Sequence, residues 1–374
     1  MTPNLTILCG DSRETLRSLP SESVQCAVTS PPYWGLRNYG VDGQLGLEKI
    51  PEEYVKNLVL VFREIRRVLR NDGTVWLNLG DSYNSGPAGA RNSKRWPKQS
   101  RNDHKPERAI SPTVKPKDLI GIPWRVAFAL QKDGWWLRSD IIWSKPNPMP
   151  ESVRDRPTKS HEYIFLLTKS GHYFYDAEAI REPISPASVK RISQPNLLNQ
   201  TGGEKDYRNG INKNRSLRKT LENFSENASG RNKRSVWTFS TRPYKGAHFA
   251  TFPTDLVLPC VLAGTSEHGC CVNCGAPYLR IVKKGDSNLE QQRACGGWKK
   301  TCQCETDAVK PCTVLDPFGG SGTTGQVAIE EGRKAIICEL NPKYIPLIEK
   351  RTHVTPGLQF LQPIAETMPR EQVI

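Results

Sequence analysis

Residues 312–325 read Cys-Thr-Val-Leu-Asp-Pro-Phe-Gly-Gly-Ser-Gly-Thr-Thr-Gly, and this stretch indicates the fold. Residues 313–315 predict a short strand, residues 316–322 a tight turn, and residues 323–331 a helix. Glycines let the backbone of such a turn approach a ligand closely, and the start of the helix offers free N–H groups. The turn lacks the lysine of a phosphate-binding P-loop. The stretch therefore predicts a strand, turn and helix that bind a ligand at the strand's carboxyl end.

The next predicted strand, residues 335–338, ends in Glu339. An acidic residue at the end of the second strand commonly accepts hydrogen bonds from ribose hydroxyls. The two features together favour a cofactor that contains a nucleoside and that is not bound through phosphates. The alternative interpretation is an ordinary α/β turn without a ligand.

Helix and strand patterns alternate along the rest of the chain. Apolar runs predict strands, and apolar positions at helical spacing predict helices. The predicted strands are residues 5–8, 24–28, 74–79, 137–143 and 163–167, and the predicted helices are residues 13–19, 53–69 and 123–132. Gly73 is expected just beyond the end of the second helix. This alternation predicts an α/β fold with a doubly wound, mainly parallel sheet.

Residues 29–34 read Thr-Ser-Pro-Pro-Tyr-Trp and directly follow the strand predicted at 24–28. Two consecutive prolines lack N–H donors, so the chain must leave the strand as a rigid extended turn. A hydroxyl, backbone carbonyls and aromatic rings are thereby held at a strand end. This combination suits a flat ligand that carries an exocyclic amine. The alternative is a Pro-Pro turn covered by structural aromatic side chains.

Taken together, these motifs resemble the S-adenosylmethionine-dependent DNA amino-methyltransferases, which modify N4 of cytosine or N6 of adenine. Residues 30–33 match the family's tetrapeptide of Asp, Asn or Ser, two prolines and an aromatic residue, and residues 316–323 match its cofactor loop. Residues 145–152, 161–168 and 248–253 match further family stretches. The catalytic half precedes the cofactor half. The resemblance implies the beta class, with a circularly permuted, Rossmann-like methyltransferase fold whose sheet is assembled from both ends of the chain.

The resemblance also implies the site. Catalysis is carried over to Ser30, Pro31, Pro32 and Tyr33. Tyr33 would stack on a base flipped out of the duplex, and the Pro31 carbonyl and Ser30 hydroxyl would accept hydrogen bonds from its amine. Cofactor contacts are carried over to Asp11, Phe249, Thr251, Pro253, Asp316, Phe318, Gly319, Gly320, Ser321, Gly322, Thr323, Glu339 and Asn341. Asp11 could instead cap a helix.

Serine at the first position of the tetrapeptide favours N4 of cytosine as the methyl acceptor, and N6 of adenine remains the alternative. An RNA methyltransferase and a non-catalytic, zinc-containing nucleic-acid-binding protein are the more distant alternatives. The net charge of +15 over 374 residues favours an anionic partner, which agrees with double-stranded DNA. The resemblance is compatible both with a companion restriction endonuclease and with a solitary enzyme; the sequence does not indicate the oligomeric state.

The cysteines predict a metal site. Eleven cysteines without a secretory signal indicate a reducing compartment. Cys271 and Cys274 form a Cys-x2-Cys-Gly turn, and Cys302 and Cys304 a Cys-x-Cys pair, so four thiolates could hold a structural zinc ion. Such a closed site leaves no position for water and carries no catalysis. Three other cysteines could replace one of the pairs: Cys270, Cys295 and Cys312. The alternative interpretation is that all of these cysteines are free.

The predicted organisation divides the chain into three parts. Residues 1–180 form the catalytic half, with a basic insertion at 83–117. Residues 181–245 form a basic target-recognition region, and residues 246–374 the cofactor-binding half, with the zinc-binding insertion at 268–306. No apolar run approaches the roughly 20 residues that span a bilayer, and the N-terminus has no signal-peptide pattern. A cytoplasmic enzyme of a bacterium, archaeon or phage is therefore expected.

Overall fold

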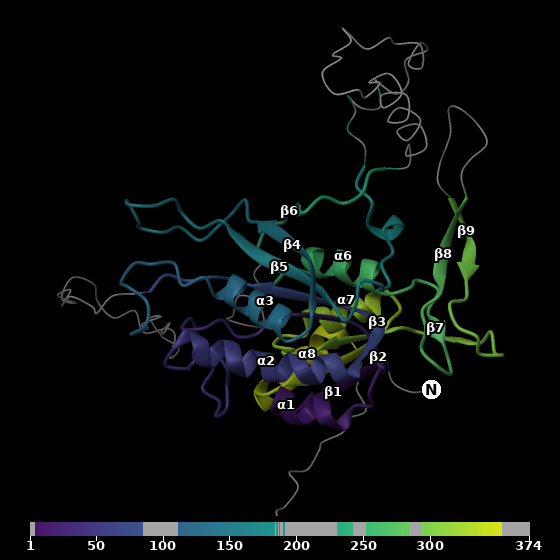
Figure 1. Ribbon diagram of the computed structural model, residues 1–374, viewed down its shortest axis with the longest axis horizontal. Helices are drawn as coiled ribbons and strands as arrows, with labels where there is room; N and C mark the ends of the chain where they lie inside the picture. Colours follow the sequence, from purple (N-terminus) through teal and green to yellow (C-terminus); the bar gives the residue numbers. More distant parts are fainter. Residues whose placement is uncertain are drawn as a thin grey trace, which may run out of the picture.

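The computed structural model describes residues 4–84, 111–183, 185, 187, 190, 230–241, 252–283 and 294–353. Its centre is an eight-stranded sheet in the order β1-β12-β11-β2-β3-β5-β4-β6 (Figure 1). In chain order the strands are β1 (Leu5–Cys9), β2 (Val24–Thr29), β3 (Leu69–Leu79), β4 (Trp136–Ser144), β5 (His161–Thr168), β6 (Val236–Thr238), β11 (Thr313–Asp316) and β12 (Lys334–Glu339). Neighbours pair in parallel except where β5 meets β3 and β4. The predicted mainly parallel α/β sheet is confirmed.

Strands from the two ends of the chain interleave in this sheet. β11 and β12 lie between β1 and β2, so that Leu5 pairs with Ala335 and Cys26 pairs with Val314. This order confirms that the sheet is assembled from both ends of the chain. Because β2 and β11 run parallel side by side, their carboxyl ends lie at the same edge.

Helices cover both faces of the sheet. They are α1 (Ser12–Thr15), α2 (Pro51–Val68), α3 (Ile122–Lys132), α6 (Thr254–Gly264), α7 (Thr323–Glu330) and α8 (Ile345–Thr352), and short 3-10 helices span Leu16–Ser18, Glu178–Ile180 and Pro342–Tyr344. Buried side chains of α2 and α3 belong to one apolar cluster, and those of α6, α7 and α8 belong to a second. The fold is therefore a three-layer sandwich, as a parallel sheet requires because both of its faces must be buried.

Helix α2 shows how local sequence positions an element. Pro51 stands at its start, Glu52 and Glu53 lie in its first turn, and Arg66 and Arg67 lie in its last turn. Acidic residues near the N-terminus and basic residues near the C-terminus both favour the helix dipole. The apolar stripe of α2 is fully buried against the sheet, which agrees with the amphipathic pattern.

The prediction that Gly73 follows the end of α2 as its terminating residue is wrong. The helix ends at Val68 and β3 begins at once with Leu69, so Gly73 lies inside the strand and does not terminate the helix. Val24 pairs with Leu69 and the next partner pair is Cys26 with Thr74, which marks an irregularity in the ladder. A Cβ atom at position 73 would lie 2.8 Å from the Gln25 carbonyl oxygen. The glycine is needed because the neighbouring strand approaches closely.

A smaller unit follows α6 and lies beside the main sheet (Figure 1). It contains β7 (Cys270–Cys271) paired with β10 (Val309–Lys310), and a hairpin of β8 (Leu279–Lys283) and β9 (Ala294–Lys299). Arg280 of the hairpin forms ion pairs with Asp176 and Glu267 at 2.9 and 2.6 Å. These ion pairs connect the hairpin with the segments that follow β5 and α6.

Several predictions fall outside the described residues. Most of the basic insertion at 83–117, most of the target-recognition region at 181–245, and two predicted cofactor residues, Phe249 and Thr251, lie there. Within the part of the chain that the structure describes, no helix is long and apolar enough to cross a membrane.

Candidate active site

Hydrogen bonds join the ends of β2 and β11. Thr29, the last residue of β2, donates its hydroxyl to Asp316 Oδ1 at 2.7 Å, and Thr324 donates to the Val28 carbonyl at 3.1 Å. The Phe318 N–H also donates to Asp316 Oδ1, at 3.1 Å. The Pro-Pro turn and the glycine loop, which are far apart in the sequence, therefore leave the sheet side by side.

A cavity of about 990 Å³ opens at this edge of the sheet, and both stretches line it. Tyr33 of the Pro-Pro turn and Phe318 of the glycine loop both line it, as they must if the two motifs form one site. The predicted site residues that line the cavity are Asp11, Ser30, Pro31, Pro32, Tyr33, Phe318, Gly319, Gly320, Ser321, Thr323, Glu339 and Asn341. A cavity of this size and mixed lining is large enough for a small organic cofactor together with a second flat group.

The two aromatic residues of the Pro-Pro turn have different environments. Trp34 is 2% exposed, and its indole N–H donates to the Glu48 carbonyl at 2.9 Å, so it belongs to the core. Tyr33 lines the cavity. The turn itself is held by the buried Tyr54, whose hydroxyl donates to the Pro32 carbonyl at 2.7 Å. The structural interpretation of this turn therefore applies to Trp34, whereas Tyr33 stands where its ring could meet a ligand in the cavity.

The hydroxyl of Tyr33 is the centre of a polar network. It donates to Glu162 Oε2 at 2.7 Å and accepts from Asn78 Nδ2 at 2.8 Å and from the Ser30 hydroxyl at 3.2 Å. Asn78 also donates to Glu162 at 2.9 Å, and Glu162 is paired with Lys145. Burial and the Glu162 carboxylate raise the pKa of Tyr33 well above its usual value, so its hydroxyl remains a donor at neutral pH.

The glycine loop after β11 is shaped by close backbone contacts. The Gly319 N–H donates to the Cys338 carbonyl at 2.8 Å, and a Cβ atom at position 319 would lie 2.1 Å from Ile337 Cγ2. Gly322 has a φ of +83°, stands at the N-cap of α7, and a Cβ there would lie 3.0 Å from Ile348. These positions admit no side chain without displacement, and they keep the loop thin beside the cavity.

Glu339 lies at the end of β12, as predicted. Its two carboxylate oxygens accept from the Gly320 N–H at 2.7 Å and the Asn341 N–H at 2.8 Å. Glu339 is 8% exposed, and burial raises its pKa to about 7 despite these backbone hydrogen bonds. The carboxylate has room for further hydrogen-bond donors from a ligand in the cavity, because each oxygen can accept more than one.

Two predicted acidic contacts have structural partners. Asp316 is 1% exposed and does not line the cavity; it joins β2 to the glycine loop, and burial raises the pKa of Asp316 to about 6. Asp11 lines the cavity, but its side chain also accepts from the Arg13 N–H at 2.8 Å and caps α1. Burial by itself would raise the pKa of Asp11, but hydrogen bonds from Arg13 outweigh this effect and lower the pKa below its usual value.

The remaining predicted residues lie at the margin of the site. Gly322 and Pro253 do not line the cavity; Pro253 is the N-cap residue of α6, and its neighbour Phe252 lines the cavity instead. Sequence reasoning did not single out Asn78, Lys145 or Glu162. Lys145 and Glu162 stand in stretches that match the family, which was the available signal, whereas Asn78 is only one of the residues near the end of β3.

The four predicted metal ligands are brought together. The Sγ atoms of Cys271, Cys274, Cys302 and Cys304 all lie within 4.8 Å of one another. Tetrahedral coordination with zinc–sulfur bonds near 2.3 Å separates sulfur atoms by about 3.8 Å. Gly275 supports the turn with a φ of +71° and an N–H that donates to the Cys271 carbonyl at 2.9 Å. The donor set and its geometry fit a structural zinc ion.

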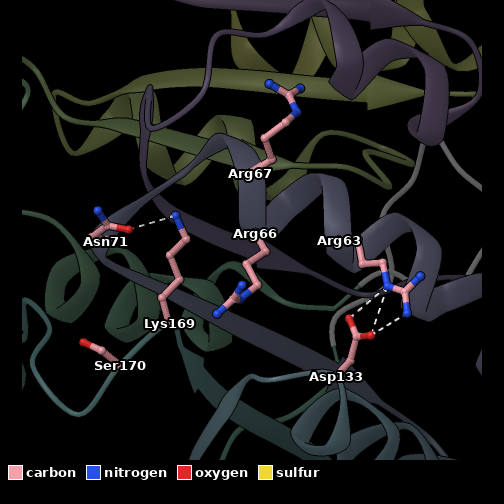
Figure 2. Close-up of a pocket in the computed structure, with 7 residues that line it drawn as sticks. All are labelled: Arg63, Arg66, Arg67, Asn71, Asp133, Lys169 and Ser170. Carbon is pink, nitrogen blue, oxygen red and sulfur yellow. Dashed lines mark hydrogen bonds and ion pairs between the residues drawn. The ribbon is translucent and has the colours of Figure 1, made fainter.

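A second cavity, of about 590 Å³, lies at the opposite edge of the sheet and has basic walls (Figure 2). Arg63 is paired there with Asp133 at 2.6 Å, and Lys169 donates to the Leu69 carbonyl at 2.6 Å and to Asn71 at 3.2 Å. No residue predicted to bind cofactor or base lines this cavity. Arg63, Arg67 and Lys169 have structural partners, whereas the buried Nε of Arg66 makes no hydrogen bond to the described residues.

The comparisons with known proteins agree with this geometry. The profile of the N6/N4 DNA methylase family matches residues 24–273 and 310–350, which is well over half of the chain.

The chain belongs to this family.

It is an S-adenosylmethionine-dependent DNA amino-methyltransferase, and DNA is its substrate. Among curated relatives, the type II methyltransferase M.Cfr9I of Citrobacter freundii is 42% identical over 352 residues, covering 92% of this chain and 87% of the relative. M.SmaI of Serratia marcescens is 41% identical, covering 92% and 89%.

The fold is also found among solved structures. PvuII DNA methyltransferase, described as cytosine-N4-specific, matches with a TM-score of 0.52 at 18% identity, covering 94% of this chain and 88% of that one. This likeness confirms a Rossmann-like methyltransferase fold for the DNA methylase.

Proposed function

We propose that this DNA methyltransferase transfers a methyl group to N4 of a cytosine flipped out of double-stranded DNA at a specific site. The observation that carries the proposal is the shared cavity, in which the Ser-Pro-Pro-Tyr turn faces the glycine loop and Glu339. Serine at the first position of the turn is typical of N4-cytosine enzymes of the family. N6 of adenine is the second candidate, because the same architecture serves both amines.

The residues present fit the cofactor. The thin glycine loop lets a ligand approach the backbone, and Glu339 offers acceptor atoms suited to ribose hydroxyls. Asp11 and Phe318 would flank the adenine, and Phe252 lines the cavity where Phe249, Thr251 and Pro253 were predicted to close the methionine end. Bound S-adenosylmethionine would supply an electrophilic methyl carbon on a positively charged sulfur.

The protein's part in the reaction is to orient the amine and stabilise charge. Tyr33 would stack on the flipped base, and the Ser30 hydroxyl and Pro31 carbonyl would accept hydrogen bonds from its exocyclic amine. These bonds direct the nitrogen lone pair towards the methyl carbon. Positive charge develops on the attacked nitrogen, and the backbone dipoles of the turn stabilise it because Ser30 carries no charge.

We also propose the organisation that the resemblance implies. The chain follows the permuted order of the beta class, with a catalytic half over residues 1–180 and a cofactor-binding half over residues 246–374. The position of Ser30 directly after β2 and of Asp316 at the end of β11 supports this order. The basic residues of 181–245 would recognise the target sequence.

A structural zinc ion would occupy the four-cysteine cluster. The carbonyl of Cys274 accepts from Arg70, and that of Gly275 accepts from Gln25 at 3.1 Å. Because Gln25 and Arg70 lie at the amino ends of β2 and β3, the metal would stabilise a knuckle that is attached to the main sheet. The closed donor set assigns it no role in methyl transfer.

The biological setting follows from the relatives, which are named type II methyltransferases. We propose that the enzyme protects cytoplasmic DNA in a restriction-modification system with a companion endonuclease of the same site preference.

The test is methylation of duplex DNA by the purified chain with isotopically labelled cofactor, followed by digestion to nucleosides and mass spectrometry. N4-methylcytosine is the expected product. N6-methyladenine would contradict the base assignment and support the second candidate. Stronger labelling of RNA than of duplex DNA in a competition assay would contradict the DNA substrate.

A further inference from the structure

The side chain of Glu162 lines the same cavity as the Pro-Pro turn. It comes from β5, the antiparallel strand, whereas Tyr33 follows β2 and Asn78 lies in β3. Side-chain exposure is 14% for Glu162 and 17% for Lys145, its ion-pair partner. The Lys145 ammonium also lies 4.2 Å from the centroid of the Trp143 ring. Three elements thus hold one partly buried carboxylate against the stacking residue.

The Glu162 side chain and the Tyr33 ring both line the cavity and are directly hydrogen-bonded to each other. Glu162 Oε2 accepts from the Tyr33 hydroxyl at 2.7 Å and from Asn78 at 2.9 Å. At Gly80, a Cβ atom would lie 2.6 Å from Tyr33 Cε2 and 3.4 Å from Glu162 Cδ. The missing side chain lets the ring edge contact the end of β3 while the ring lines the cavity. The ring is therefore fixed at both its edge and its hydroxyl.

We propose that Glu162 is a positioning residue that holds Tyr33, by its hydroxyl, in the orientation needed to stack on the flipped base. This inference rests on the proposed function of Tyr33 and adds a second group to it. A hydrogen bond to a carboxylate is stronger than one between neutral groups, and it holds the ring in place before the base arrives. Without it the ring can rotate, and the amine is presented to the methyl carbon less accurately.

The experiment compares Glu162→Gln, Tyr33→Phe and the double variant in single-turnover methyl transfer to duplex DNA. Tyr33→Phe keeps the ring and removes only the hydroxyl. Each single variant is expected to slow transfer about tenfold while the cofactor dissociation constant stays within about twofold. The double variant is expected to be no slower than the slower single variant, because both changes break the same hydrogen bond.

Glu64→Gln is the matched control. Glu64 is a partly exposed carboxylate paired with Arg67 at 2.8 Å on α2, away from the cavity. It should leave the transfer rate unchanged. A wild-type rate for Glu162→Gln would overturn the proposal. So would losses that multiply in the double variant, since Glu162 would then act independently of Tyr33.

Two further outcomes keep the test decisive. If Glu162→Gln does not fold, as judged by its melting temperature, Tyr33→Phe alone decides, and an unchanged transfer rate for it overturns the proposal. If the wild-type chain methylates adenine, the base assignment fails while the coupling between Glu162 and Tyr33 can still be measured on that product.

Discussion

Glu339 connects the glycine loop to the start of the segment after β12 through the N–H groups of Gly320 and Asn341. A carboxylate accepts hydrogen bonds more strongly than a carboxylic acid, so a ligand with ribose hydroxyls should prefer the ionised form. Burial raises the pKa of Glu339 to about 7 in the free protein. Binding of the cofactor should therefore lower this pKa and be coupled to proton release.

We predict that cofactor affinity increases between pH 6 and pH 8. Below the raised pKa most Glu339 is protonated, so affinity should fall by up to about tenfold per pH unit and level off above pH 7. Isothermal titration calorimetry at several pH values measures this. Glu339→Gln serves as the control, because it should bind more weakly with a flatter pH profile. An identical pH profile in the variant would contradict the assignment.

We predict that Gly320→Asp weakens cofactor binding by about a hundredfold. Gly320 has a φ of +52°, and a Cβ there meets no atom closer than 3.9 Å, so aspartate can be accommodated and would project into the cavity beside Glu339. The matched control is Gly332→Asp, at a φ of +71° with open space and outside the cavity. It should lose stability similarly and keep its cofactor affinity. Equal affinities in a cofactor titration would remove Gly320 from the site.

Residue identity alone did not predict which of the expected cofactor-binding side chains line the cavity. Asp11 and Asp316 were both predicted as cofactor contacts, yet Asp316 is enclosed between Thr29 and Phe318. A carboxylate at a strand end can accept from a ligand or from the neighbouring loop. Only the position of the neighbouring strand decides which of these occurs.

At the level of elements, the turn that carries Cys271 and Cys274, the proposed zinc knuckle, is attached to β2 and β3. Gln25 of β2 donates to the Gly275 carbonyl and accepts from the Thr313 N–H of β11 at 2.6 Å. Together with Arg70 of β3, these contacts connect the knuckle to three strands of the main sheet. Without metal, four thiol groups would lie close together with nothing to hold the turn. Loss of the ion should therefore lower the thermal stability of the main sheet.

We predict about one zinc ion per chain, and a melting temperature lowered by roughly 5–10 °C in Cys302→Ser. Atomic absorption and thermal unfolding followed by circular dichroism measure the two quantities. Cys295→Ser is the matched control, because Cys295 is exposed on β9 and lies outside the four-thiolate group. Full zinc content and an unchanged melting temperature in Cys302→Ser would contradict the metal site.

The junction of α2 with β3 shows how one element limits another. Helical periodicity located α2 to within two residues at its start and one residue at its end. The strand that follows begins earlier than its apolar run, because Leu69 pairs with Val24 of β2. Pairing with β2 extends the strand through a polar stretch. The apolar periodicity of the sequence does not predict this contact, because it depends on a neighbouring strand.

On the scale of the whole molecule, the net charge of +15 governs the approach to DNA. Each lysine or arginine that neutralises a phosphate releases counterions, so binding weakens steeply with salt. We predict that the dissociation constant for duplex DNA rises by about two orders of magnitude between about 50 and 200 mM salt. Fluorescence anisotropy with a labelled duplex measures it. A dissociation constant that does not change with salt would contradict phosphate contacts as the main source of affinity.

The sequence by itself determined the two motifs, the mainly parallel α/β class and the set of four cysteines that the structure brings together. It could do so because prolines, glycines and apolar spacing restrict the backbone locally. Tertiary structure decided that Ser30 and Phe318 share a cavity, that Asp316 is enclosed, and that Glu162 reaches Tyr33 from the antiparallel strand. These facts depend on strand order and register, which arise from contacts between segments distant in the chain.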